Sequence, residues 1–208
     1  MMQLAGLLAR DGLAPNVRIL IGIAVSIWHA DWPKVTAWVK LAKERDCPRK
    51  DIEETLLQCV LFCGFPRVIT AFEHFNNNWP TDQAPTGGNL PVEEQASAGD
   101  ELFHSIYGKN DAAVRSMLQG YHQELHDFVL EAAYSRILTR PQLPAKKREL
   151  IAISVLAAQG QERQFAGHAR GAKHLGASSE EFCEALVTTF GSEPAGATDV
   201  EFWMSLTQ

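Results

Sequence analysis

The chain has 208 residues, which is long enough for one domain with a sizeable core or for two fused halves. Its 46% hydrophobic and 21% charged residues are ordinary for a globular protein, and a net charge of −6 argues against a general nucleic-acid surface, which needs a basic patch. The longest strongly apolar run, Ile19 to Trp28, is about half of the roughly 20 residues that a membrane-spanning helix needs, and the N-terminal stretch is a poor signal peptide. We therefore expect a cytoplasmic protein that binds neither nucleic acid nor membrane.

Helical periodicity runs along nearly the whole chain, and the alternation typical of strands is absent. Proline and capping residues support several helix starts, such as Pro33 after Asp31 and the Ser178/Glu181 capping box. The sequence predicts an all-α protein. Its helices are expected at about 2–10, 15–29, 32–46, 49–63, 66–77, 91–107, 111–119, 121–138, 144–159, 161–175, 178–190 and 198–207.

Residues 76–90 form the only long stretch rich in helix-breaking residues. We expect this stretch to be an exposed connector that divides the chain. The predicted organisation is an N-terminal repeat at 1–78, a connector with helices at 79–120, and a C-terminal repeat at 121–208.

The two halves repeat each other, because residues 18–58 match residues 148–188 at a constant offset without a gap. A gapless match through three helices favours a true duplication over chance similarity between amphipathic helices. Duplicated helical units can pack about a pseudo-two-fold axis, and one copy can keep a site while the other becomes scaffold. The identical pairs are Arg18/Arg148, Leu20/Leu150, Ile21/Ile151, Ile23/Ile153, Val25/Val155, Ala42/Ala172, Lys43/Lys173, Glu54/Glu184 and Leu56/Leu186.

An acid and a histidine in the second half are the most informative polar residues. Glu149 is predicted in the first turn of one helix and His168 in the middle of the next. In the first half, Ile19 and Trp38 occupy the equivalent positions, so the fold does not require the pair. Taken alone, Glu149 fits a helix-dipole or surface role, and His168 fits a core histidine.

Several motifs occur in an order and spacing that resemble the carboxymuconolactone decarboxylase family, which is related to AhpD-type alkylhydroperoxidases. The resemblance covers most of residues 15–190 and implies an AhpD-like helical fold made of two duplicated repeats. The motifs are R-E-L-I-x-I-x-x-L-A-A (148–158), H-x-R-G-A (168–172), G-A-S-x-E-E (176–181), E-x-L (184–186), the run from Glu53 to Pro66, Ile106-Tyr107-Gly108, Tyr134 and Arg140-Pro141-x-Leu143.

The redox branch of this family carries a C-x-x-C-x-x-x-H motif preceded by a glutamate. Here the glutamate and histidine positions are Glu149 and His168, but the cysteine positions hold Gln161 and Gln164. A dithiol peroxidase needs a thiolate and a resolving thiol, which this site lacks. We expect the two glutamines to point inward on the face of His168.

The decarboxylase branch does not use the cysteine pair, and the resemblance implies cofactor-free and metal-free chemistry on a small carboxylated, lactone-type substrate. We expect His168 to act as acid and base, with Glu149 fixing its tautomer. Substrate-binding groups are expected at Gln161 and Gln164, and on the preceding helix at Tyr134 and Arg136.

Two other functions stay open at this stage. The protein can be a non-catalytic oligomeric scaffold or small-molecule binder, because the first half tolerates loss of the pair. Thiol chemistry would require Cys59 and Cys63, or Cys183, although we expect Cys47 and the other cysteines to be reduced core thiols. We also expect a homo-oligomer, either a dimer or a trimer.

Two further patterns have alternative interpretations. His122 and His126 have a spacing that can chelate a metal, but solvated helix histidines are the simpler interpretation. Trp28, Trp32 and Trp38 fit core packing, with a ligand-stacking face or a subunit interface as the alternative.

Overall fold

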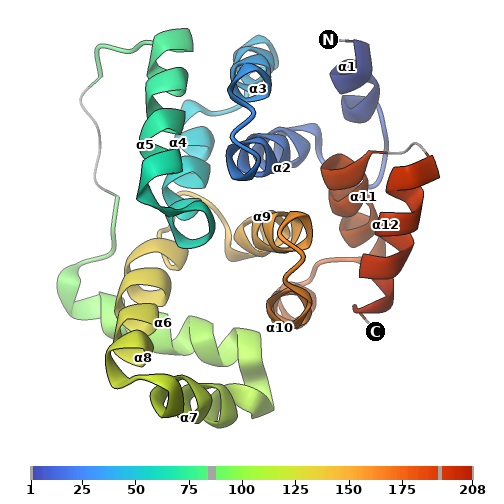
Figure 1. Cartoon of the computed structure of the whole chain (residues 1–208). Helices are drawn as coiled ribbons and strands as arrows, with labels where there is room; N and C mark the ends of the chain where they lie inside the picture. Colours follow the sequence, from blue (N-terminus) through green and yellow to red (C-terminus); the bar gives the residue numbers. More distant parts are fainter. Residues whose placement is uncertain (1, 84–87, 192–193, 208) are drawn as a thin grey trace.

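The computed structural model describes residues 2–83, 88–191 and 194–207, and all regular secondary structure within them is helical (Figure 1). The elements are α1 (Met2–Leu8), α2 (Pro15–Trp28), α3 (Trp32–Glu44), α4 (Arg49–Gln58), α5 (Val60–Asn78), α6 (Val92–Tyr107), the 3₁₀ turn η1 (Gly108–Asn110), α7 (Asp111–Tyr121), α8 (Gln123–Phe128), the π-helix η2 (Val129–Leu138), α9 (Ala145–Ala158), α10 (Glu162–His174), α11 (Ser179–Phe190) and α12 (Pro194–Ser205).

The predicted all-α class is confirmed, although several predicted helices have other bounds. The helix expected at 49–63 ends at Gln58, and the chain bends by 115° into α5. Inside α5, Gly64 has a φ of 76°, and Pro66, which lacks an N–H, follows this kink. The helix expected at 121–138 starts after an extended residue, His122, and continues as a π-helix from Val129.

The duplication is visible in the helix boundaries. α2, α3 and α4 begin at residues 15, 32 and 49, and α9, α10 and α11 begin at 145, 162 and 179, which is 130 residues later in each case. The backbone follows the same offset, since Ala30 and Gly160, and likewise Asp46 and Gly176, all have positive φ. The two repeats therefore share one backbone path through three successive helices.

The centre of the molecule is formed by α2 and α9, which lie side by side with α3 and α10 on their outer sides (Figure 1). Ile19, Ile21 and Ile23 on α2 are fully buried, as are Ile151 and Ile153 on α9. A helix that is apolar on nearly all sides is stable in water only when other elements surround it. The two central helices thus form the core on which both repeats pack.

A buried ion triad joins the first repeat to the second. Glu54 on α4 accepts hydrogen bonds from Arg140 at 2.7 Å and from Arg148 on α9 at 2.7 Å. Arg148 is 1% exposed, and it also donates to Oε1 of Gln58 and to the carbonyl oxygen of Leu143. Burial alone would raise the pKa of the Glu54 carboxyl, but the hydrogen bonds from the two arginines lower that pKa.

The same triad occurs a second time with the repeats exchanged. Glu184 on α11 accepts hydrogen bonds from Arg10 at 2.6 Å and from Arg18 on α2 at 2.7 Å. Arg18 is fully buried and also donates to Oγ1 of Thr188, which stands 130 residues after Gln58. Each repeat therefore supplies the carboxylate that pairs with two arginines of the other.

A second, smaller core lies between α6 and η2. α6 packs against η2 and α10, and the buried side chains there are Phe103, Ile106, Tyr134 and Leu138. Residues 81–83 of the expected connector are exposed, and residues 84–87 lie outside the described residues. The division of the chain at residues 78 and 121 stays a prediction.

No single helix among the described residues has the length and hydropathy needed to cross a membrane. The bent pair α4 and α5 passes that test together, on length and composition only.

The two triads predict unequal costs of removing their carboxylates. Glu54→Gln should lower the free energy of unfolding by about 3–5 kcal/mol, because it leaves the buried charges of its two arginines without a counter-ion. The matched Glu184→Gln should cost less, because the side chain of Arg10 is 39% exposed and keeps part of its hydration. Urea unfolding at pH 7 measures both costs, and an equal or reversed order would contradict this prediction.

The contribution of Glu54 to the free energy of unfolding should be complete above the pKa of about 4.3 of an unfolded glutamate and be lost as the pH falls towards its lower folded pKa.

Candidate functional site

Glu149 and His168 form a direct hydrogen-bonded pair between α9 and α10. Nδ1 of His168 lies 2.9 Å from Oε2 of Glu149. The side chain of Glu149 is 2% exposed and that of His168 is 12% exposed. Glu149 is the fifth residue of α9 rather than a residue of its first turn, so the alternative of an exposed helix-dipole acid is wrong.

The electrostatics of the pair favour a protonated histidine. Burial alone would lower the pKa of His168, but the charge of Glu149 and the hydrogen bond to it outweigh burial and raise the pKa. With Nδ1–H donating to the carboxylate, Nε2 is the ring nitrogen left for chemistry, and no hydrogen-bond partner of Nε2 is found among the described residues. The ring of Phe62, from the first repeat, meets the imidazole edge to face, with centroids 6.1 Å apart.

Two tyrosines complete the buried surroundings of the carboxylate. The hydroxyl of Tyr134 donates to the hydroxyl of Tyr107 at 3.0 Å. Burial raises the pKa of both tyrosines, and the negative charge of Glu149 raises both further, so the carboxylate acts on each ring. Both hydroxyls therefore stay protonated at neutral pH. The positive charge of Arg170 acts in the opposite direction and offsets part of the rise in the pKa of Tyr107.

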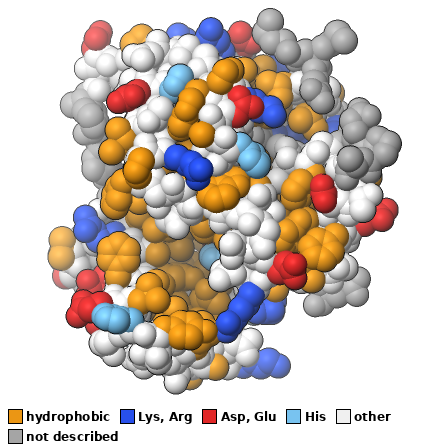
Figure 2. Space-filling model, in the orientation of Figure 1, with side chains coloured by type: hydrophobic (Ala, Val, Ile, Leu, Met, Phe, Trp, Pro, Cys, Tyr) orange, Lys and Arg blue, Asp and Glu red, His pale blue; other side chains and the backbone are white. Residues whose placement is uncertain are grey.

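A glycine makes room for this arrangement. A Cβ at Gly171 would lie 2.7 Å from Cγ2 of Ile106 and 3.1 Å from Oε2 of Glu149. The absence of a side chain at this position lets α6 approach α10 closely and leaves space for the carboxylate. Figure 2 shows this face of the molecule hollowed between the α6–α8 end of the chain and α10, with hydrophobic side chains along the hollow.

Gln161 and Gln164 do not point inward, and this expectation is wrong. Both are exposed, because Gln161 is the N-cap residue of α10 and the buried side of the helix is formed by Phe165 and Ala169. By helical spacing, the two glutamines continue the stripe of His168 outward to solvent. They therefore stand on the solvent-exposed side of the candidate site rather than against the carboxylate.

The two residues of the preceding helix predicted to bind substrate point to different sides of that helix. Tyr134 is buried and reaches the site, whereas Arg136 is exposed. In a π-helix with about 4.4 residues per turn, residues two apart point to nearly opposite sides, so η2 directs Arg136 away from the side of Tyr134. Sequence reasoning missed the roles of Phe62 and Tyr107, although Tyr107 stands in a motif that carried the family resemblance.

His122 and His126, and the three tryptophans of the first repeat, have structural surroundings in this fold. Nδ1 of His122 accepts the N–H of Glu124 at the start of α8, and Nδ1 of His126 lies 2.8 Å from a carboxylate oxygen of Asp127. Within the described ranges, no group of three or more histidine, cysteine or acidic side chains is placed to hold a metal ion. Among the tryptophans, Trp28 donates to the carbonyl oxygen of Ala158, Trp32 stacks on His74, and Trp38 is 2% exposed.

Comparisons with known proteins agree with this arrangement. The sequence profile of the carboxymuconolactone decarboxylase family matches residues 1–76 and 123–190. The chain is 25% identical over 182 residues to Peroxisomal protein 2 of Schizosaccharomyces pombe, an alignment that covers 84% of this chain and 85% of that protein. It is 30% identical over 97 residues to 4-carboxymuconolactone decarboxylase of Acinetobacter baylyi, covering 46% of this chain and 72% of that protein. The two separate profile matches fit the two repeats.

The coupling between Glu149 and His168 predicts a shifted histidine titration. An NMR titration should give His168 a pKa above 6.5, and Glu149→Gln should bring it below 6.5, because burial then acts unopposed. The pair should stabilise the fold fully below the unfolded histidine pKa of about 6.5 and lose this contribution as the pH rises through the folded pKa. An unchanged titration in the variant would show that the carboxylate does not control the imidazole.

The cysteines of the α4–α5 bend should differ in reactivity. A hydrogen bond from the Cys59 thiol lowers the pKa of Cys63, and the nearby charge of Arg67 lowers it further, whereas burial raises the pKa of Cys47 to about 11. Iodoacetamide should therefore alkylate Cys63 before Cys47 and Cys59, as followed by mass spectrometry. Arg67→Gln should slow Cys63 and leave Cys183 unchanged as an internal reference; equal rates at all four thiols would contradict this ranking.

Proposed function

Because the chain belongs to the carboxymuconolactone decarboxylase family, we propose that its second repeat carries out cofactor-free decarboxylation or proton transfer on a small carboxylated substrate of the lactone type. The observation that carries the proposal is the buried 2.9 Å hydrogen bond between Nδ1 of His168 and Glu149. The bond gives His168 a raised pKa and leaves Nε2 available to a substrate, and a general acid needs both properties.

The proposed reaction needs few groups. The bond between the substrate carbon and its carboxylate breaks, carbon dioxide leaves, and the electron pair stays on the carbon, delocalised into the lactone carbonyl as an enolate. Nε2–H of His168 then delivers a proton to that carbon, and solvent returns a proton to the imidazole. Glu149 stabilises the imidazolium form and fixes the ring orientation.

The tyrosine pair suits the stabilisation of the enolate. Because the hydroxyl of Tyr134 donates to Tyr107, the hydroxyl proton of Tyr107 is left to donate to an enolate oxygen. A neutral donor in a buried site stabilises a developing charge more strongly than the same group does in water. For the substrate carboxylate we propose Arg170 as the cation, because its charge acts on Tyr107, although its side chain is exposed like that of Arg136.

A non-catalytic binding role is the second candidate. The relative aligned over 84% of this chain, Peroxisomal protein 2, has a name that states no reaction, whereas the alignment with the decarboxylase covers 46%. The surroundings of the Glu149–His168 pair would then hold a ligand without transforming it. Thiol peroxidase chemistry at this site is not supported, because glutamines stand where that reaction needs sulfur.

A turnover assay separates the two candidates. The protein should decarboxylate 4-carboxymuconolactone, or a related carboxylated lactone, as followed by release of carbon dioxide. His168→Ala should lower kcat/KM by about 100-fold or more, because general acid–base catalysis contributes about 10²–10⁴-fold. His174→Ala is the matched control, since this histidine is exposed on the same helix, and it should keep wild-type turnover. Binding of these lactones without turnover by the wild-type protein would favour the binding role instead.

A further inference from the structure

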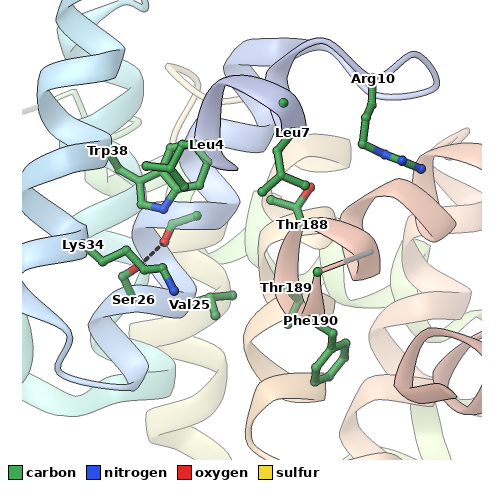
Figure 3. A pocket seen from close by; sticks show the side chains of 13 residues that line it. Leu4, Leu7, Arg10, Val25, Ser26, Lys34, Trp38, Thr188, Thr189 and Phe190 are labelled. Atoms are coloured by element: carbon green, nitrogen blue, oxygen red, sulfur yellow. Dashed lines mark hydrogen bonds between the residues drawn. The ribbon is translucent and has the colours of Figure 1, made fainter. Parts of the chain in front are cut away.

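The first repeat contains a pocket at the place that corresponds to the candidate catalytic site of the second. Its volume is about 360 Å³, within the range of about 300–1,000 Å³ of small-molecule sites. α2 and α3 form one side, and α1 and the C-terminal end of α11 form the other (Figure 3). At the offset of 130 residues, Trp38 stands in the position of His168 and Lys34 in that of Gln164.

The first repeat has the same backbone path as the second but different side chains at the positions of the acid–base pair. A Cβ at Gly22 would lie 2.2 Å from an atom of the Trp38 ring, so the indole lies directly on the backbone of α2. Ile19 replaces the carboxylate, and Leu4 on α1 takes the position of Tyr134. Apolar side chains therefore stand at the positions of Glu149, His168 and Tyr134, and the walls of the pocket come from the elements equivalent to those around that pair.

The walls of the pocket are mainly apolar, and one cationic side chain in them is available to a ligand. Leu4, Leu7 and Val25 face the cavity together with the indole of Trp38 (Figure 3). Arg10 also lines the pocket, but its guanidinium is held by both carboxylate oxygens of Glu184. The hydroxyls of Ser26 and Thr189 are committed as donors to carbonyl oxygens of their own helices.

Lys34 is the side chain that gives the pocket its charge. Its only acidic neighbour among the described residues is Asp31, at 4.0 Å and on the solvent side, where both side chains are about half exposed. An exposed pair at this distance is weak and leaves the ammonium available to a ligand. The side chain runs from α3 along the pocket between Trp38 and Val25 (Figure 3).

We propose that this pocket is a second, non-catalytic binding site for a small organic anion with a flat apolar body, such as an aromatic carboxylate. Lys34 holds the carboxylate, and the rings of Trp38 and the aliphatic side chains of α1 and α2 hold the body. The site acts independently of the chemistry at His168, because it shares no residue with that pair.

Calorimetric titration with sodium benzoate and with 2-naphthoate tests this site. Saturable binding is expected in the wild-type protein and also in His168→Ala, which removes the contribution of the candidate catalytic site. Lys34→Met should weaken binding by about tenfold, which corresponds to about 1.4 kcal/mol. Because Lys34 is more than half exposed, this variant should fold normally, as circular dichroism will verify.

Two controls define the site and its preference. Thr189→Trp, at a half-buried position on the pocket wall, should abolish binding by filling the cavity. Benzamide, which has the shape of benzoate without its charge, should bind at least about tenfold more weakly to the wild-type protein and equally to wild type and Lys34→Met. The proposal is overturned if neither carboxylate binds, if benzamide binds as tightly as benzoate, or if His168→Ala and not Lys34→Met abolishes binding.

Discussion

The buried ion triads that join the two repeats are the constraint on which the rest of the structure depends. Glu54 of the first repeat forms ion pairs with Arg140 and Arg148, and Glu184 of the second forms ion pairs with Arg18 and Arg10. A buried arginine without its carboxylate is strongly unfavourable, so each repeat depends on the other for the carboxylate that pairs with its buried arginines. The triads therefore fix α4 against α9 and α11 against α2, and this fixes which surfaces of the repeats meet.

The candidate site follows from that docking. Arg148 lies beside Glu149 in sequence, so the residue that anchors the first repeat and the carboxylate of the site belong to one helix. The chain that leaves α4 continues directly into α5, which delivers Phe62 to the ring of His168. The acid–base pair belongs to the second repeat, but one wall of its surroundings comes from the first. A single repeat would leave that wall open to water.

The two repeats show how one backbone supports two kinds of pocket. In the second, Gly171 and Gly167 let α10 approach Ile106 and Tyr107 of α6, and the polar pair joins α9 to α10. In the first, the large indole of Trp38 lies against Gly22, and apolar groups replace the pair. The backbone path is therefore shared by the two repeats, while the side chains at the equivalent positions differ in chemistry. The hydrogen-bonded Glu149–His168 pair is thus confined to one half of the molecule.

The sequence by itself determined the all-helical class, the duplication and the Glu149–His168 pair, because helical periodicity, capping and motif spacing are local properties. The sequence also contains a sign of the triads, because Arg18/Arg148 and Glu54/Glu184 are among the identical pairs of the duplication. Only the tertiary structure decided that Glu149 is buried, that Gln161 and Gln164 face solvent, and that Tyr107 rather than Arg136 reaches the site. The physical reason is that these outcomes depend on where α5, α6 and the π-helix η2 pack. Their positions are set by contacts between residues far apart in the chain, which no local pattern records.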